Sequence, residues 1–241
     1  MGEIASFLEF KPQTGLLADF SAESFGCRLY AVCGGQLCLS SEGTHYGFVQ
    51  DGETVLCTDA GEFSLRAGMY FSLPASGVVE SSGLVMISTR LDWRGFFSIG
   101  GPIEQSGRLR YIDGCADSLL IGPPVKGDPC LNLLHIPPGI DQTQHTHPTL
   151  RSGVIVSGGG HCVTTEGSVP LERGKLFAIR PNGRHSFHTM DQELLVIAFH
   201  PDSDCGPSHD DHPMINRTIV EGQSARNKPE IATTELPEVT R

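Results

Sequence analysis

The stretch Gly139-Ile-Asp-Gln-Thr-Gln-His145-Thr-His147-Pro-Thr-Leu-Arg151 decides how the rest of the chain is interpreted. It places two histidines, His145 and His147, two residues apart. Alternate side chains of a β-strand point to the same face, so the two imidazoles are predicted to project together. Two imidazoles on one face suit the binding of one metal ion.

A second stretch, Gly174-Lys-Leu-Phe-Ala-Ile-Arg-Pro181-Asn-Gly183-Arg-His185, supplies a third histidine. Its Pro-Asn-Gly sequence predicts a turn, after which His185 can arrive from another strand. A lone histidine is usually a surface residue or a core residue whose hydrogen bonds are satisfied. Three histidines between glycine-punctuated strands favour a metal site instead. We therefore predict that His145, His147 and His185 are metal ligands.

The two stretches resemble the signature motifs of the cupins, which are small β-barrels. The first cupin motif is G-x5-H-x-H followed by a glutamate and a glycine, and the positions that match it are Gly139, His145, His147 and Gly158. The second motif is roughly G-x5-P-x-G-x2-H, and with small changes of spacing the positions that match it are Gly174, Pro181, Gly183 and His185. The resemblance implies a double-stranded β-helix, or jelly-roll, barrel that binds a metal.

Arg151 stands where the cupin motif has its glutamate. A guanidinium only donates hydrogen bonds, so it cannot replace a ligating carboxylate. Some cupins, among them certain dioxygenases, resemble this chain in using three histidines without the glutamate. The alternative is a site that has lost tight metal binding. If Arg151 points into the same cavity, it can contact a substrate anion in bidentate fashion.

An internal repeat indicates that the barrel occurs twice. Four residues have identical partners 106 positions further on: Gly61, Leu65, Gly68 and Phe71. At the same offset His145 falls on Leu39 and His147 on Ser41, so the first copy lacks the ligand set. The predicted fold class is all-β, with two tandem cupin barrels.

The predicted domains follow from this repeat. Residues 1–110 form a degenerate N-terminal cupin barrel without metal ligands, residues 111–220 form the metal-binding C-terminal barrel, and residues 221–241 form a polar tail. The first 25 residues or so read as an irregular lead-in. Short apolar runs separated by turn residues predict strands, and no long 3.6-residue period predicts a helix.

The composition agrees with a turn-rich β protein and reduces the number of possible classes of function. The 241 residues are 39% hydrophobic and include 29 glycines and 16 prolines. A net charge of −11 disfavours nucleic acid and anionic membrane surfaces as partners. Neither a signal sequence nor an apolar run of membrane-spanning length is present. We therefore expect a cytoplasmic protein, whose eight cysteines are mostly reduced thiols.

The resemblance implies an enzyme class without naming a substrate. Bicupins with three-histidine iron sites that resemble this chain are ring-cleaving dioxygenases of hydroxylated aromatic acids. We expect one divalent ion (Fe, Zn, Mn or Ni) and a dioxygenase, or a related lyase or isomerase, that acts on a small anionic molecule. The alternatives are a non-catalytic small-molecule or metal-sensing protein and a purely structural metal. By analogy with other cupins, we expect a homodimer.

Other polar residues are secondary candidates. His161 and His188 are candidates to orient a ligand, and His135 is expected to be structural. Arg184 is a second candidate for contact with a substrate anion. His209 and His212 lie in a polar, aspartate-rich stretch that is interpreted as an exposed loop.

Overall fold

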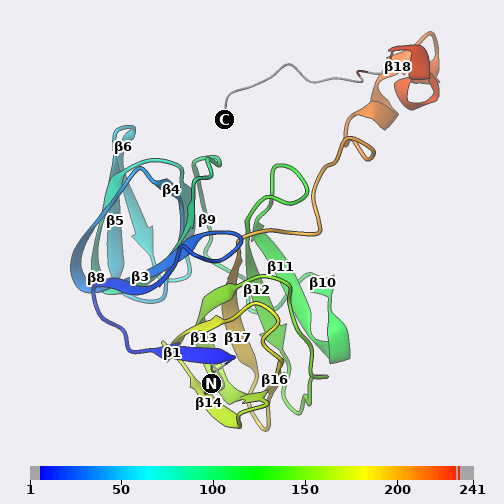
Figure 1. Ribbon diagram of the computed structural model, residues 1–241. Coiled ribbons are helices and arrows are strands. Elements are labelled where there is room, and N and C mark those ends of the chain that lie inside the picture. Colours follow the sequence, from blue (N-terminus) through cyan, green and yellow to red (C-terminus); the bar gives the residue numbers. More distant parts are fainter. Residues whose placement is uncertain (1–5, 232, 234–241) are drawn as a thin grey trace.

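The computed structural model describes residues 6–231 and 233, and its regular structure is almost entirely β-strand (Figure 1). The strands form two large antiparallel sheets, each rolled into a jelly-roll barrel. The predicted all-β fold with two tandem barrels is confirmed. Within the described residues the helices are short 3-10 turns: η1 (Ile112–Gly114), η2 (Ile215–Arg217), η3 (Ala225–Asn227) and η4 (Pro229–Ile231). None of these is long and apolar enough to cross a bilayer.

The first sheet has eight strands, ordered β2-β3-β8-β4-β7-β9, with β5 paired to β8 and β6 paired to β5. Their bounds are β2 (Gly15–Phe20), β3 (Cys27–Leu39), β4 (Gly43–Val49), β5 (Glu53–Thr58), β6 (Gly61–Arg66), β7 (Tyr70–Leu73), β8 (Gly77–Leu91) and β9 (Ser98–Gly100). The long strands β3 and β8 pair over most of their length.

The second sheet has nine strands, ordered β1-β15-β13-β17-β12-β11-β10, with β14 and β16 paired to β13. Their bounds are β1 (Phe7–Phe10), β10 (Leu109–Arg110), β11 (Ala116–Ile121), β12 (Cys130–Ile136), β13 (Arg151–Thr164), β14 (Ser168–Glu172), β15 (Leu176–Ile179), β16 (His185–His188) and β17 (Leu194–His200).

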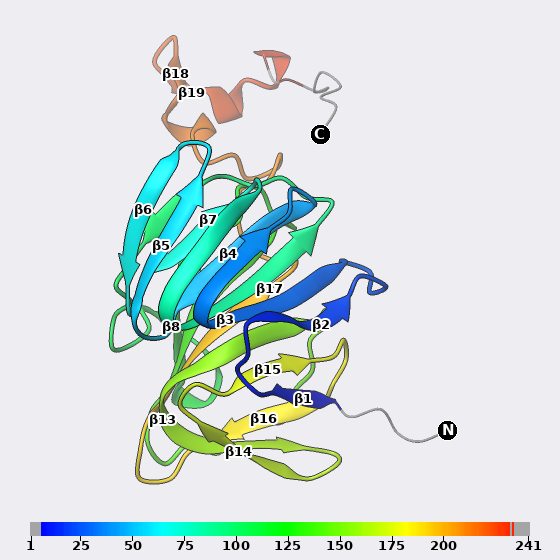
Figure 2. The ribbon, with the colours of Figure 1, turned by 90° about the vertical axis from the view of Figure 1, so that its left-hand side faces the viewer.

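The expectation of an irregular lead-in is wrong. β1 pairs antiparallel with β15 of the second barrel before the chain enters the first barrel through β2 (Figure 2). Phe7 is buried and stacks on Phe177, with 5.4 Å between the ring centroids. The N-terminal strand thus belongs to the sheet formed by the end of the chain. Apolar burial outweighs the weak local signal of four residues.

The repeat seen in the sequence reappears in the strand pairing. His45 of β4 pairs with Leu73, and Arg151 of β13, 106 positions on, pairs with Ile179. Gly68 and Gly174 both have a φ near +84° (84° and 83°), a conformation that glycine adopts without strain. The two barrels therefore share one strand plan at one offset.

The barrels are joined by a common apolar core. Tyr46 of the first barrel contacts Phe199 of the second, with 5.0 Å between their ring centroids. The hydroxyls of Ser88 and Ser152 form a buried hydrogen bond of 2.8 Å across the same boundary. On β17 the residues alternate: Leu195, Ile197 and Phe199 lie in this shared core, whereas the intervening side chains face the interior of the second barrel.

Residues up to Pro207 still bond to loops of the second barrel, and the chain beyond them projects away from both barrels (Figures 1 and 2). It forms a small hairpin of β18 (Ile219–Val220) and β19 (Gln223–Ser224). The predicted polar tail, residues 221–241, thus contains β19 and two 3-10 turns. Residue 232 and residues 234–241 lie outside the described part of the chain.

Candidate metal centre

A cavity of about 90 Å³ lies inside the second barrel. The two-residue period of its strands selects the lining, because alternate side chains face inward. β17 supplies Val196, Ala198 and His200, and β15 supplies Phe177 and Ile179. The remaining lining residues are Tyr111, Asp117, Asn132, Leu134, Gln142, His145, His147, Arg151, His185 and Phe187.

Three of these side chains form a cluster suited to a metal ion. The candidate ligand atoms of His145, His147 and His185 all lie within 4.8 Å of one another. The ring centroids of His145 and His185 are 4.6 Å apart, and that of His147 is 5.1 Å and 5.3 Å from the other two. Across residues 6–231 and 233, this is the one group of histidine, cysteine or carboxylate side chains with such spacing.

Backbone hydrogen bonds fix which ring nitrogens can bind a metal. The Nδ1 of His145 is 2.8 Å from the carbonyl of Thr143, and the Nδ1 of His185 is 2.9 Å from the carbonyl of Gly183. A carbonyl only accepts, so each Nδ1 carries the proton and each Nε2 keeps a free lone pair. This is the usual way in which a protein orients a metal-binding imidazole.

The protonation state of the cluster also fits a metal site. Burial, with Arg151 as the next cause, lowers the pKa of His147 to about 3. Burial lowers the pKa of His185 to about 4. Both rings are therefore neutral near pH 7, which is the form that coordinates a metal. The residues present thus fit a divalent ion.

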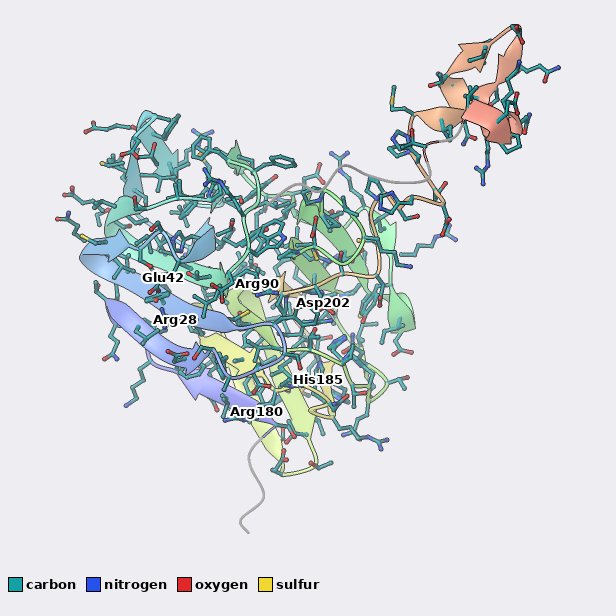
Figure 3. All side chains as sticks on the ribbon, turned by 45° about the horizontal axis from the view of Figure 1, so that its top comes forward. Arg28, Glu42, Arg90, Arg180, His185 and Asp202 are labelled. Atoms are coloured by element: carbon teal, nitrogen blue, oxygen red, sulfur yellow. The ribbon has the colours of Figure 1, made fainter. Side chains whose placement is uncertain are left out.

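The expectation that His145 and His147 lie on a regular strand is wrong, because β13 begins only at Arg151. His145 instead makes an isolated bridge to His185. The backbone amide of each donates to the carbonyl of the other, at N–O distances of 2.9 Å and 3.0 Å. His147 accepts at its carbonyl from the Asn182 amide at 2.7 Å. These hydrogen bonds at and beside the Pro-Asn-Gly turn, rather than the ladder of a regular strand, therefore position the histidines. Figure 3 shows His185 among the strands of the second barrel.

Arg151 lines the same cavity and its guanidinium is held from one side. Its Nη1 donates to the Thr149 hydroxyl at 2.5 Å and to the Leu150 carbonyl at 2.9 Å, and lies 3.8 Å from a carboxylate oxygen of Asp202. The Nε is buried and has no hydrogen-bond partner among the described residues. One edge of the guanidinium is therefore fixed by the protein, whereas the buried Nε has a donor left for a ligand.

His200, Asp117 and Asn132 are among the polar lining residues that were not singled out in the sequence. His200 ends β17, and its ring centroid is 6.4 Å from that of His147. Burial, then Arg151 and His147, lower the pKa of His200 well below its ordinary value. Asp117 and Asn132 line the cavity from β11 and β12. The missed signal is a polar residue at an inward position of an otherwise apolar strand.

The secondary candidates lie elsewhere. His188 bonds to Asp141 at 2.8 Å and to the Ser186 hydroxyl at 2.7 Å, and His161, opposite it on β13, is exposed. Arg184 is exposed and donates to the Gln144 side chain at 3.1 Å. Three further histidines also lie outside the cavity: His135, which is 3.1 Å from Glu193, and the exposed His209 and His212.

The first barrel has no corresponding centre among its described residues. At the position of Arg151 it carries His45, which is 1% exposed. Both ring nitrogens of His45 are satisfied at 2.7 Å, one by the Thr89 hydroxyl and one by the Ser40 carbonyl. Burial lowers the pKa of His45, so the ring is a neutral core residue.

Comparison with known proteins supports the fold assignment. No family model and no curated protein sequence matches the chain. Among solved structures, a cupin 2 conserved barrel domain protein from Leptotrichia buccalis aligns with a TM-score of 0.57 at 10% identity, over 84% of this chain and 92% of that one. The fold is that of the cupins.

Two further structural neighbours are enzymes by their descriptions. Salicylate 1,2-dioxygenase from Pseudoaminobacter salicylatoxidans, in adducts with gentisate, aligns with a TM-score of 0.51 at 11% identity, over 72% of this chain and 68% of that one. Oxalate decarboxylase from Bacillus subtilis, which has Mn(II) centres, aligns with a TM-score of 0.53 at 9% identity, over 98% of this chain and 89% of that one. At such identities the likeness concerns the fold alone.

Proposed function

We propose that this protein is a bicupin that binds one divalent metal ion through His145, His147 and His185 and acts on a small anionic molecule. The observation that carries the proposal is the triad itself: three histidine ligand atoms within 4.8 Å of one another, beside Arg151 in one cavity. In this proposal the second barrel holds the chemistry. The first barrel packs against it and has no ligand set among its described residues.

The proposed reaction class follows from the three imidazole ligands of the metal. Three neutral imidazoles leave the full charge of a divalent ion uncompensated, so anionic ligands are favoured. When bound, the metal supplies Lewis-acid or one-electron chemistry at positions that the protein leaves open. We assign the protein to the metal-dependent dioxygenases or the related lyases and isomerases. The dioxygenase and the decarboxylase described above are in keeping with this choice.

The protein's own residues bind and orient the substrate. Arg151 lines the cavity, and in this proposal its Nε, which has no partner among the described residues, donates to the carboxylate of the substrate. The apolar side chains of Phe177, Phe187 and Val196 line the cavity and keep its polar contacts in a low-dielectric setting. His200 lines the same cavity.

Oxygen uptake tests this proposal. The iron-loaded protein, prepared without oxygen, is expected to consume oxygen when mixed with one or more members of a panel of small carboxylic acids. A metal-loaded protein that binds an acid but forms no product from it, with or without oxygen, would identify a binding or sensing role instead. A protein that binds no divalent metal after reconstitution would show that Arg151 marks a site without metal.

Replacing Arg151 with lysine is expected to weaken the binding of small carboxylates about tenfold or more, because lysine keeps the charge but loses the planar donor edge. Bound metal should be unchanged, since Arg151 is not a ligand. Isothermal titration and metal analysis measure the two effects separately. Arg184→Lys is the matched control, because Arg184 is exposed and outside the cavity, and it should leave both values at the wild-type level. Equal acid affinity in the Arg151 variant and the wild type would contradict the assigned role.

A further inference from the structure

The cavity contains a pair of hydrogen-bond acceptors that the proposed metal chemistry does not use. Asp117 comes from β11 and Asn132 from β12, and both line the cavity that holds the histidines. Neither belongs to the cluster of candidate metal ligands. The hydrogen bond between them is long, 3.5 Å from the Asn132 Nδ2 to a carboxylate oxygen of Asp117.

This pair is left incompletely satisfied by the protein. The Asn132 Oδ1 is buried and has no hydrogen-bond partner among the described residues. Asp117 makes no ion pair within 4.0 Å in the same part of the chain, and the nearest guanidinium in the cavity, Arg151, pairs with Asp202 instead. A buried acceptor without a donor destabilises the folded protein. Such a group is retained where a ligand or a water supplies the missing donor.

The apolar neighbours of Asp117 and Asn132 support a role of the two side chains in ligand recognition. Asn132 pairs across the sheet with Ala198, and Asp117 pairs with Leu134, so both acceptors stand among apolar neighbours. A leucine at position 132 would match the rest of β12 and cost nothing in unmet hydrogen bonds. Burial also raises the pKa of Asp117, which agrees with the lack of a cationic partner.

The cavity therefore offers both kinds of hydrogen-bonding group: donors at Arg151 and acceptors at Asp117 and Asn132. We propose that Asp117 and Asn132 form a subsite for a hydrogen-bond donor, so that the ligand is a small amino or hydroxy carboxylic acid. This inference rests on the proposed function, which places the carboxylate of the ligand at Arg151 and the metal. The ammonium or hydroxyl group of the ligand then donates to the Asn132 Oδ1 and to the Asp117 carboxylate.

The size of the cavity narrows the choice of probes. A volume of about 90 Å³ corresponds to roughly six to nine water-sized positions, at about 10–15 Å³ for each. Acids with six or seven non-hydrogen atoms match this space. Two matched sets are suitable: 3-aminopropionate and 3-hydroxypropionate against butyrate, and 4-aminobutyrate and 4-hydroxybutyrate against pentanoate. Within each set the carboxylate and the chain length stay constant, and only the terminal group changes.

The test is isothermal titration of the zinc-loaded full-length protein with these six acids. In at least one set, an acid with a terminal donor is expected to bind at least about tenfold more tightly than its methyl counterpart. Asn132→Leu and Asp117→Asn should each reduce that ratio at least threefold. Asp210→Asn, a change of an exposed aspartate in the C-terminal segment, is the matched control and should preserve it.

The possible results separate this inference from the proposed function. Stoichiometric zinc with no preference for donor-bearing acids in either set, or a preference that both variants retain, would overturn the donor subsite alone. An absence of zinc together with a donor preference in the metal-free protein would overturn the metal site and support the subsite. Circular dichroism identifies a variant that fails to fold. If Asn132→Leu fails, the decision rests on Asp117→Asn, which keeps the shape of the side chain.

Discussion

Replacement of His145 and His147 together by alanine is expected to reduce bound metal from about one ion per chain to background. The loss of a single group that merely orients a ligand typically costs about 10–100-fold in metal affinity, so the loss of two direct ligands should exceed that range. The fold should survive, because neither side chain belongs to an apolar core cluster and neither forms a ladder of a regular strand. Elemental analysis after reconstitution and dialysis measures the effect.

A matched control removes two histidines elsewhere in the chain. His209 and His212 are both exposed and lie in the segment that leaves the second barrel. The His209→Ala/His212→Ala variant should therefore bind metal as the wild type does. Metal retained by the His145→Ala/His147→Ala variant, or lost in the control, would contradict the assignment of the ligands.

Phe199→Ala is expected to lower the free energy of unfolding by about 3–5 kcal/mol. Phe199 is fully buried in the core shared by the two barrels and contacts Tyr46 of the first barrel. The truncation removes apolar contacts on both sides of the boundary and leaves a cavity that close-packed neighbours fill only in part. Urea unfolding followed by circular dichroism measures the change, and Met190→Ala, which alters a side chain that is 73% exposed, should stay within about 0.5 kcal/mol of the wild type.

The shared core also predicts how the protein unfolds. The single tryptophan, Trp93, packs against this core and stacks near Tyr46, with 6.3 Å between the ring centroids. Its fluorescence should therefore report loss of the boundary, whereas circular dichroism reports loss of strands in both barrels. The two transitions are expected to coincide, which is the behaviour of one cooperative unit. Separate transitions would mean that each barrel is stable alone.

The sequence was sufficient to predict the fold class and the clustering of the three histidines. Both depend on local patterns: glycines and turns at fixed spacing, apolar runs of strand length, and histidines beside them. The offset of 106 positions was visible because Gly68 and Gly174 occupy the same turn conformation in each barrel. Such positions constrain the residue type strongly, so the repeat persists where the rest has diverged.

Other features depend on contacts that no local pattern contains. β1 pairs with β15 about 170 positions along the chain, and nothing in Phe7–Phe10 identifies that partner. The segment with His145 and His147 was expected to be a strand. The two-residue spacing of the histidines alone cannot distinguish a paired β-strand from an extended loop that is hydrogen-bonded to a turn. His200 and Asn132 were recoverable in principle, since each is a polar residue on an inward position of an apolar strand. Recognising them required knowing which face of β12 and β17 is turned inward.

The central claim is that three imidazoles hold one metal ion and leave coordination positions open. X-ray absorption by the zinc-loaded protein tests it most directly. We expect three imidazole nitrogens at about 2.0–2.1 Å, together with at least one oxygen from water or a bound acid. Four imidazoles would mean that His200 closes the site, and a sulfur neighbour at about 2.3 Å or fewer than three imidazoles would mean that the ion binds elsewhere. Either result would contradict the account.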